Sequence, residues 1–208
     1  MVRKNSYLII ITFLFLSFNQ INAQWRLGVQ GGLNLAKYTV THLDNSSKIS
    51  SKIGITIGTE LHYIINEQFE ILSGIRYDQK GGKITHSFPT FSGNATVYYN
   101  YVEVPFQIIY IPFDIETRPI LFTGLDLGYI VTDKAEGIIN NQKIVEDYLQ
   151  YIDNRFDVYF DGGVGIMPNI TNNIYYSITV SYYYGLYDLT ELISANGVHF
   201  LLGVTFRL

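Results

Sequence analysis

The chain has 208 residues, of which 48% are hydrophobic and 15% charged, and its formal net charge at pH 7 is −4. This length suits one domain of moderate size, and the acidic balance disfavours a nucleic-acid-binding protein. The absence of cysteine excludes a disulfide framework and a thiolate metal site.

Residues 1–23 are predicted to be a secretory signal peptide that is cleaved from the mature protein. Arg3 and Lys4 form a positive n-region, residues 7–18 form an apolar core, and Ala23 supplies a small residue before the cut. The apolar run is shorter than the roughly 20 residues that a transmembrane helix needs, so a retained anchor is the weaker alternative. We therefore expect residues 24–208 to form one mature domain, with 12 basic and 18 acidic residues.

Eight segments of the mature chain alternate between apolar residues and polar or small residues, which is the period of a β-strand with two different faces. In chain order they cover residues 25–35, 52–63, 69–78, 101–110, 121–129, 156–166, 174–184 and 198–208. In the last segment Phe200 and Leu202 share one face, and His199 and Gly203 share the other. The chain ends on this strand, and pairing with the first strand in a closed barrel would remove its unpaired edge.

The charged residues of these segments all fall on the polar face. We expect the following eleven to form a charged cluster in the lumen of the barrel: Arg26, Lys52, Glu60, Glu70, Arg76, Asp78, Glu103, Asp126, Asp157, Asp161 and Arg207. A soluble barrel needs the reverse arrangement, whereas charges inside and hydrocarbon outside are typical of a barrel in lipid. The sequence therefore predicts an all-β, eight-stranded antiparallel up-and-down transmembrane β-barrel.

The connections between the segments support this topology. Short connections at residues 66–68, around 112–114 and at 168–173 alternate with long polar ones at about 37–51, 80–100, 132–155 and 186–196. Short periplasmic turns and long outer loops are typical of bacterial outer-membrane barrels. Six tyrosines near strand ends are expected to form an aromatic girdle at the membrane interfaces: Tyr63, Tyr77, Tyr110, Tyr129, Tyr182 and Tyr184.

Two local features carry further expectations. In the third long loop, Ile144, Tyr148 and Tyr151 have helical spacing, which predicts a short helix over the barrel mouth. Pro105 cannot donate a ladder hydrogen bond, so we expect a bulge near Glu103.

Several stretches resemble the PorT-like family of small outer-membrane β-barrels. They are Gly28–Asn34, Ile75–Gly82, Tyr101–Phe106, the region around Gly124, and Tyr182–Leu186. The resemblance implies a barrel in the outer membrane of a Gram-negative bacterium. It also implies an accessory role in protein export, without catalysis. It transfers no functional site, because the matching positions are structural.

The charged lumen allows two interpretations. It could be a selectivity lining or a proton path, or it could be a salt-bridged plug that fills the interior. Confined charges must be paired or hydrated, and an eight-stranded barrel is only wide enough for side chains to fill. These two arguments favour the plug.

No catalytic, cofactor or metal site is predicted. His62 and His199 point inward, and Ser177 and Ser181 could approach His199, but no nucleophile motif and no metal-ligand spacing is present. Our leading hypothesis is a non-enzymatic barrel in outer-membrane lipid whose outer loops dock proteins of envelope assembly or a secretion complex, with no nucleic acid. The alternatives are a narrow porin-like pore for small solutes or ions and, less favoured, a lipid-modifying or proteolytic enzyme.

Overall fold

A computed structural model describes residues 24–40, 47–88, 91–139, 142–146, 155–171, 173–186 and 193–208, so the predicted signal peptide lies outside the described residues. Within them the structure contains ten β-strands. They are β1 (Gln24–Val40), β2 (Ser47–Ile64), β3 (Phe69–Ser73), β4 (Arg76–Phe88), β5 (Phe91–Tyr110), β6 (Thr117–Ile139), β7 (Gln142–Glu146), β8 (Phe156–Thr171), β9 (Ile174–Gly185) and β10 (Ile193–Arg207). None of the described residues belongs to a helix long and apolar enough to cross a membrane.

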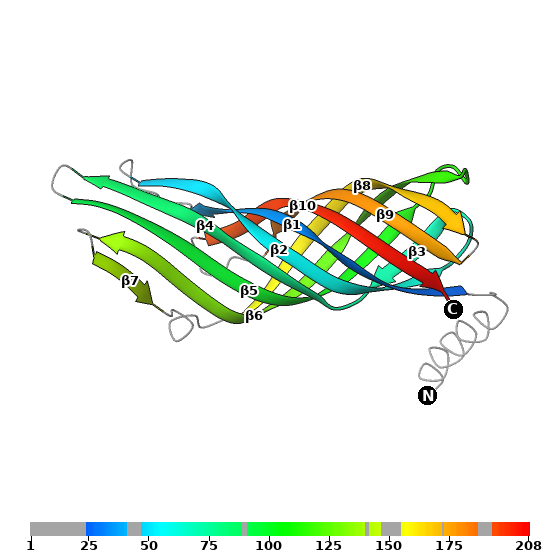
Figure 1. Ribbon diagram of the computed structural model, residues 1–208, viewed down its shortest axis with the longest axis horizontal. Helices are drawn as coiled ribbons and strands as arrows, with labels where there is room; N and C mark the ends of the chain where they lie inside the picture. Colours follow the sequence, from blue (N-terminus) through cyan, green and yellow to red (C-terminus); the bar gives the residue numbers. More distant parts are fainter. Residues whose placement is uncertain are drawn as a thin grey trace, which may run out of the picture.

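The strands form a closed antiparallel ring (Figure 1). β1 pairs with β2 and β10, β10 with β9, β9 with β8, β8 with β6, and β6 with β5. β3 and β4 together fill the position between β2 and β5. The ring thus has eight strand positions, which confirms the predicted eight-stranded barrel, and β10 has no free edge because both of its sides are paired.

The third position of the ring is interrupted at Gly74 and Ile75, between β3 and β4. Across the interruption the amide of Ile75 donates to Oγ1 of Thr59 at 3.2 Å, and the amide of Thr59 donates to the carbonyl of Ile75 at 2.9 Å. The side chain and backbone of Thr59 therefore replace the missing ladder bonds.

Pro105 lies opposite this interruption. On that side of β5, Glu103 pairs with β4 and Phe106 pairs with β3, so the residues between them have no ladder partner. A residue without an N–H fits there because no donor is needed. A register shift of β5 against β6 does lie near Glu103, at Asn100/Tyr101, and not at Pro105 itself.

The two faces of the barrel have opposite chemistry. Large apolar side chains point outward, and Leu33, Ile55 and Leu202 keep 53%, 55% and 63% of their surface exposed. Polar side chains such as Asn34 and His199 point inward and are fully buried. This inverts the pattern of soluble domains and matches a barrel surrounded by hydrocarbon.

At the end far from the C-terminus several strands continue beyond the barrel (Figure 1). β5 has 20 residues and β6 has 23, whereas about 9–11 residues cross a bilayer. β4 and β5 form a hairpin that pairs as far as Phe88 and Phe91, and β6 pairs with β7. The predicted helix is therefore wrong over residues 142–146, which form a strand; residues 147–151 lie outside the described residues. We call the ends of β4, β5, β6 and β7 the outer sheet.

Candidate functional site

The lumen is the part of the barrel with the most concentrated chemistry. Its middle level, here called the ionic layer, is made of Arg76, Asp78, Lys80, Glu103, Asp126, Asp161 and His199, all buried. The guanidinium of Arg76 donates to Oε2 of Glu103 at 2.6 and 3.0 Å and to Oδ2 of Asp126 at 2.6 Å. Its Nη1 lies 3.9 Å from Oδ2 of Asp161. Arg76 thereby links β4 to β5, β6 and β8.

Asp78 is the second centre of the ionic layer and links β4 to β1, β2 and β10. Its carboxylate accepts hydrogen bonds from Nδ2 of Asn34 at 3.0 Å and Oγ1 of Thr56 at 2.6 Å. Nε2 of His199 lies 3.0 Å from Oδ2, and Nζ of Lys80 lies 3.6 Å from it. Together the Arg76 and Asp78 groups cross the whole lumen.

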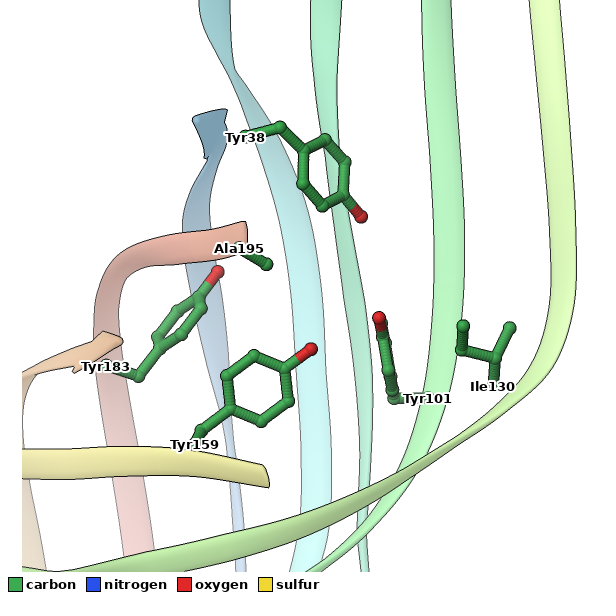
Figure 2. Close-up of a cluster of buried hydrophobic side chains, with 6 residues drawn as sticks. All are labelled: Tyr38, Tyr101, Ile130, Tyr159, Tyr183 and Ala195. Atoms are coloured by element: carbon green, nitrogen blue, oxygen red, sulfur yellow. The ribbon is translucent and has the colours of Figure 1, made fainter. Parts of the chain in front are cut away.

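Above the ionic layer lies a tyrosine layer, formed by Tyr38, Tyr101, Ile130, Tyr159, Tyr183 and Ala195 (Figure 2). Tyr159 packs edge-on against both Tyr101 and Tyr183, with ring centroids 5.9 and 5.7 Å apart. Nζ of Lys80 lies 3.2 Å from the ring centroid of Tyr159 and 4.4 Å from that of Tyr183, and it also binds Glu103. These rings and the ammonium between them join the outer mouth to the ionic layer.

Below the ionic layer, at the periplasmic end, an apolar basal layer consists of Leu72, Ile109, Ile111, Ile120, Met167 and Tyr175. Arg26 pairs with Glu70 beside it, and Nδ1 of His62 lies 3.1 Å from Oε2 of Glu70. The guanidinium carbon of Arg26 lies 4.5 Å from the ring centroid of Tyr175. Side chains thus fill the lumen of the described barrel at three levels.

A cavity of about 30 Å³ remains between the ionic and basal layers. It is lined by Glu60, His62 and Asp161. Nε2 of His62 lies 3.5 Å from Oε2 of Glu60, but these two atoms and Oδ1 of Asp161 make no hydrogen bond among the described residues. Ser177 and Ser181 also line it. A buried water occupies roughly 10–15 Å³ on this measure, so the cavity has room for about two waters that can satisfy these atoms.

The structure places ten of the eleven predicted lumen residues inside the barrel: Arg26, Lys52, Glu60, Glu70, Arg76, Asp78, Glu103, Asp126, Asp157 and Asp161 are buried. Arg207 departs from the expectation. It has inward parity, but it is exposed because it is the last residue of β10 and lies at the periplasmic rim opposite Arg26.

Sequence reasoning missed Lys80, whereas the alternation put Tyr101, Tyr159 and Tyr183 on the inward face where the structure has them. Lys80 was assigned to a loop, yet it continues the inward parity of Arg76 and Asp78, so extending the alternation by one further step could have found it. Lys52 is buried without a hydrogen-bond partner for Nζ among the described residues, and it lies 4.2 Å from the ring centroid of Tyr98.

The six predicted girdle tyrosines all point outward. Tyr63 contacts Trp25, and Tyr110 contacts Phe69, with ring centroids 4.8 and 5.1 Å apart at the periplasmic end. The exposed side chains of Tyr129, Tyr182 and Tyr184 and the half-buried one of Tyr77 lie on the other strands of the wall. Their membrane depth stays a prediction.

The candidate serines and histidines are partly brought together. Ser181 pairs with His199 across β9 and β10, whereas Ser177 pairs with Gly203, four residues along β10. Both Ser181 and His199 are buried beneath the tyrosine layer. The side chains of His42 and His86 lie outside the described residues. Among the described residues no group of three or more histidine or acidic side chains is arranged to hold a metal ion.

Solved structures share the fold at low identity. A major outer membrane protein from Thermus thermophilus has a TM-score of 0.53 and 9% identity, covering 90% of this chain and all of that one. Neisserial surface protein A has a TM-score of 0.46 and 15% identity, covering 88% and 97%. The N-terminal β-barrel domain of OprF from Pseudomonas aeruginosa has a TM-score of 0.43 and 15% identity, covering 90% and 100%.

A search among curated proteins finds no match. The profile of the family described as "Outer membrane protein beta-barrel domain" matches residues 18–191, most of the chain. The inverted burial, the closed eight-position ring and this match agree, and they place the protein in the outer membrane, surrounded by lipid. The chain belongs to the outer-membrane β-barrel domain family.

Proposed function

We propose that this protein is a non-enzymatic accessory barrel that docks a protein of envelope assembly or export through its outer sheet. The observation that carries the proposal is the filling of the lumen by the tyrosine, ionic and basal layers. With the interior occupied by the chain's own side chains, the outer sheet is the large surface left for a partner.

The resemblance to the PorT-like family supports the same role, because it implies an accessory of protein export. The stretches that carry it include Ile75–Gly82, which begins at the interruption of the third ring position and contributes Arg76, Asp78 and Lys80 to the ionic layer. In this interpretation the resembling residues keep the barrel rigid, and the outer sheet supplies specificity.

A narrow cation pore is the second candidate, and the sign of the lumen charge favours it. Eight buried acidic side chains face four buried lysines and arginines in the described barrel: Glu60, Glu70, Asp78, Glu103, Asp126, Asp133, Asp157 and Asp161 against Arg26, Lys52, Arg76 and Lys80. The tyrosine and basal layers oppose this function, because they would have to move before an ion could pass.

We also infer that the protein is not an enzyme. Ser181, His199 and Asp78 approach the composition of a nucleophilic triad, but His199 and Asp78 are fully buried in the ionic layer. A catalytic group must reach its substrate. We expect His199→Gln to leave the lipid and protein profiles of the outer membrane unchanged.

The deciding experiment replaces residues 84–95, the tip of the β4–β5 hairpin, with an Asn-Gly turn in the chromosomal copy. We expect loss of secretion or of envelope integrity with normal barrel abundance, and we expect no discrete conductance from the purified wild-type barrel in planar bilayers. Unchanged secretion and envelope integrity would count against docking. Discrete, cation-selective steps would instead support the pore.

A further inference from the structure

Three lysines stand on the outer wall of neighbouring strands, and we call them the lysine row: Lys37 of β1, Lys48 of β2 and Lys83 of β4. All three are exposed. Lys48 pairs with Thr85 and Lys83 pairs with Ser50, so the two lysines are diagonal neighbours about 7–8 Å apart. The neighbouring Gly82 faces the buried ring of Tyr38, which fixes Lys83 on the opposite, outward side.

The lysine row lies beyond the outer end of the lipid-facing apolar band. On β1 the outward residue before Lys37 is Leu35, and on β2 the apolar band ends at Ile53. Within the described part of the chain no ion-pair partner is found for any of the three lysines, whereas Lys134 on β6 is paired with Glu136. The three lysines place positive charge on this part of the outer wall.

A shallow, open groove of about 960 Å³ lies on the same side of the barrel, below the lysine row. Its lining is mainly apolar and includes Val29, Ile57, Tyr77 and Leu202. At its floor is Gly31, an outward position of β1 without a side chain. A Cβ at Gly31 would meet only the carbonyl oxygen of Thr56, at 3.6 Å, which is an ordinary van der Waals distance. The backbone of the neighbouring strand therefore leaves room for a side chain at Gly31.

The distance between groove and lysine row matches one leaflet of the membrane. Six residues separate Gly31 from Lys37, which is roughly 20 Å of strand at about 3.3 Å per residue. At a strand tilt of about 40° this is about 15 Å along the membrane normal, half of the roughly 30 Å hydrocarbon core. The groove thus lies near the bilayer centre, and Lys37 lies at the level of the outer headgroups, with Lys48 and Lys83 on the strands beside it.

We propose that the outer wall of β1, β2 and β4 is a binding site for a phosphorylated lipid of the outer leaflet. The phosphate pairs with Lys37, Lys48 and Lys83, and an acyl chain runs down the wall into the groove at Gly31. Charge complementarity selects a phosphorylated headgroup over a neutral one, and the groove selects a lipid over a soluble anion. This site adjoins the outer-sheet tip at residues 84–95, since Thr85 pairs with Lys48, but none of the three lysines belongs to that tip.

The test measures lipid binding to the purified mature barrel in detergent by native mass spectrometry. The probe is bisphosphorylated lipid A, and the comparison lipid is the same molecule with both phosphates removed. We expect a Lys37→Gln/Lys48→Gln/Lys83→Gln variant to bind the bisphosphorylated lipid about tenfold more weakly or worse. The matched control, Arg118→Gln/Lys134→Gln/Arg207→Gln, removes the same charge elsewhere and should bind as wild type does.

A second variant tests the groove. Gly31→Leu fills it from its floor, and the space around the Cβ position lets the barrel fold. We expect weaker binding of both lipids by a similar factor, with the preference for the phosphorylated lipid kept. Equal binding of the two lipids by wild-type protein, or equal losses in the two triple variants, would overturn the proposal. Complete competition by inorganic phosphate would also overturn it, because the ligand would then be a free anion. A wild-type dimer that Gly31→Leu converts to a monomer would overturn it too, because a second copy of the chain would then occupy the groove.

Discussion

Arg76 joins β4 to three other strands, since it contacts acidic residues of β5, β6 and β8. Arg76→Gln removes the cation that pairs with Asp126 and leaves Glu103 with Lys80 as its cationic partner among the described residues. Breaking a buried ion pair in this way typically costs about 3–5 kcal/mol. We expect a loss of that order in the free energy of unfolding, measured by urea titration in lipid vesicles.

The matched control is Arg118→Gln. Arg118 forms an ion pair with Asp114 at 2.7 Å in a partly exposed position near a periplasmic turn, where such pairs contribute about 0–1 kcal/mol. Equal losses for the two variants would show that the ionic layer is hydrated and adds little to stability.

Outward residues should respond to charge according to membrane depth. Leu202 lies in the groove near the bilayer centre, whereas Leu208 ends the chain at the periplasmic rim. We expect Leu202→Arg to reduce the free energy of unfolding by about 2–4 kcal/mol and Leu208→Arg by at most about 1 kcal/mol. The same vesicle-based titration measures both. A larger loss at Leu208 would contradict the assigned depth.

At the scale of strands, the alternation of residue types was enough to predict the barrel. Phe200 and His199 fall on opposite faces of β10, as their chemistry indicated, because lipid and lumen impose different solubility on alternate residues. The ends of the strands could not be predicted in this way. Beyond the membrane both faces meet water, so the outer sheet carries no such alternation, and residues 142–146 were expected to be helical. The three layers of side chains in the lumen could not be predicted from the sequence either, because they depend on which residues of different strands lie at the same height in the barrel.

Two adjacent glycines of β1 test how closely that strand approaches β10. A Cβ on Gly32 would lie 1.9 Å from the carbonyl oxygen of Phe200, whereas a Cβ on Gly31 has room. We expect Gly32→Ala to force the β1–β10 seam apart and to cost about 1–3 kcal/mol, and Gly31→Ala to cost less than about 1 kcal/mol. Thermal or urea unfolding of the two variants in the same vesicles makes the comparison. A neutral Gly32→Ala would mean that the seam is wider than the structure has it.

At the scale of the whole molecule, the barrel and the outer sheet are stabilised by different interactions. The barrel is closed by ring pairing and filled by its three layers, whereas the outer sheet is held mainly by ladder pairs beyond the membrane. Stability should therefore reside in the barrel, and the proposed docking function assigns partner recognition to the outer sheet.

The hairpin replacement of residues 84–95 separates these two properties. It removes pairs of β4 with β2 and β5, and of β5 with β6, in the outer sheet, but it leaves Arg76, Asp78, Lys80 and Tyr101 in place. The lipid-facing band and the lumen layers keep their contacts, so we expect the free energy of unfolding to change by less than about 1 kcal/mol. The m-value should be slightly smaller because less surface is exposed on unfolding. A chain that no longer folds into vesicles would show that the outer sheet nucleates the barrel. In that case a secretion defect of the same variant would reflect failed folding. Point substitutions of the exposed Asn94 and Thr85 would then test docking through the outer sheet.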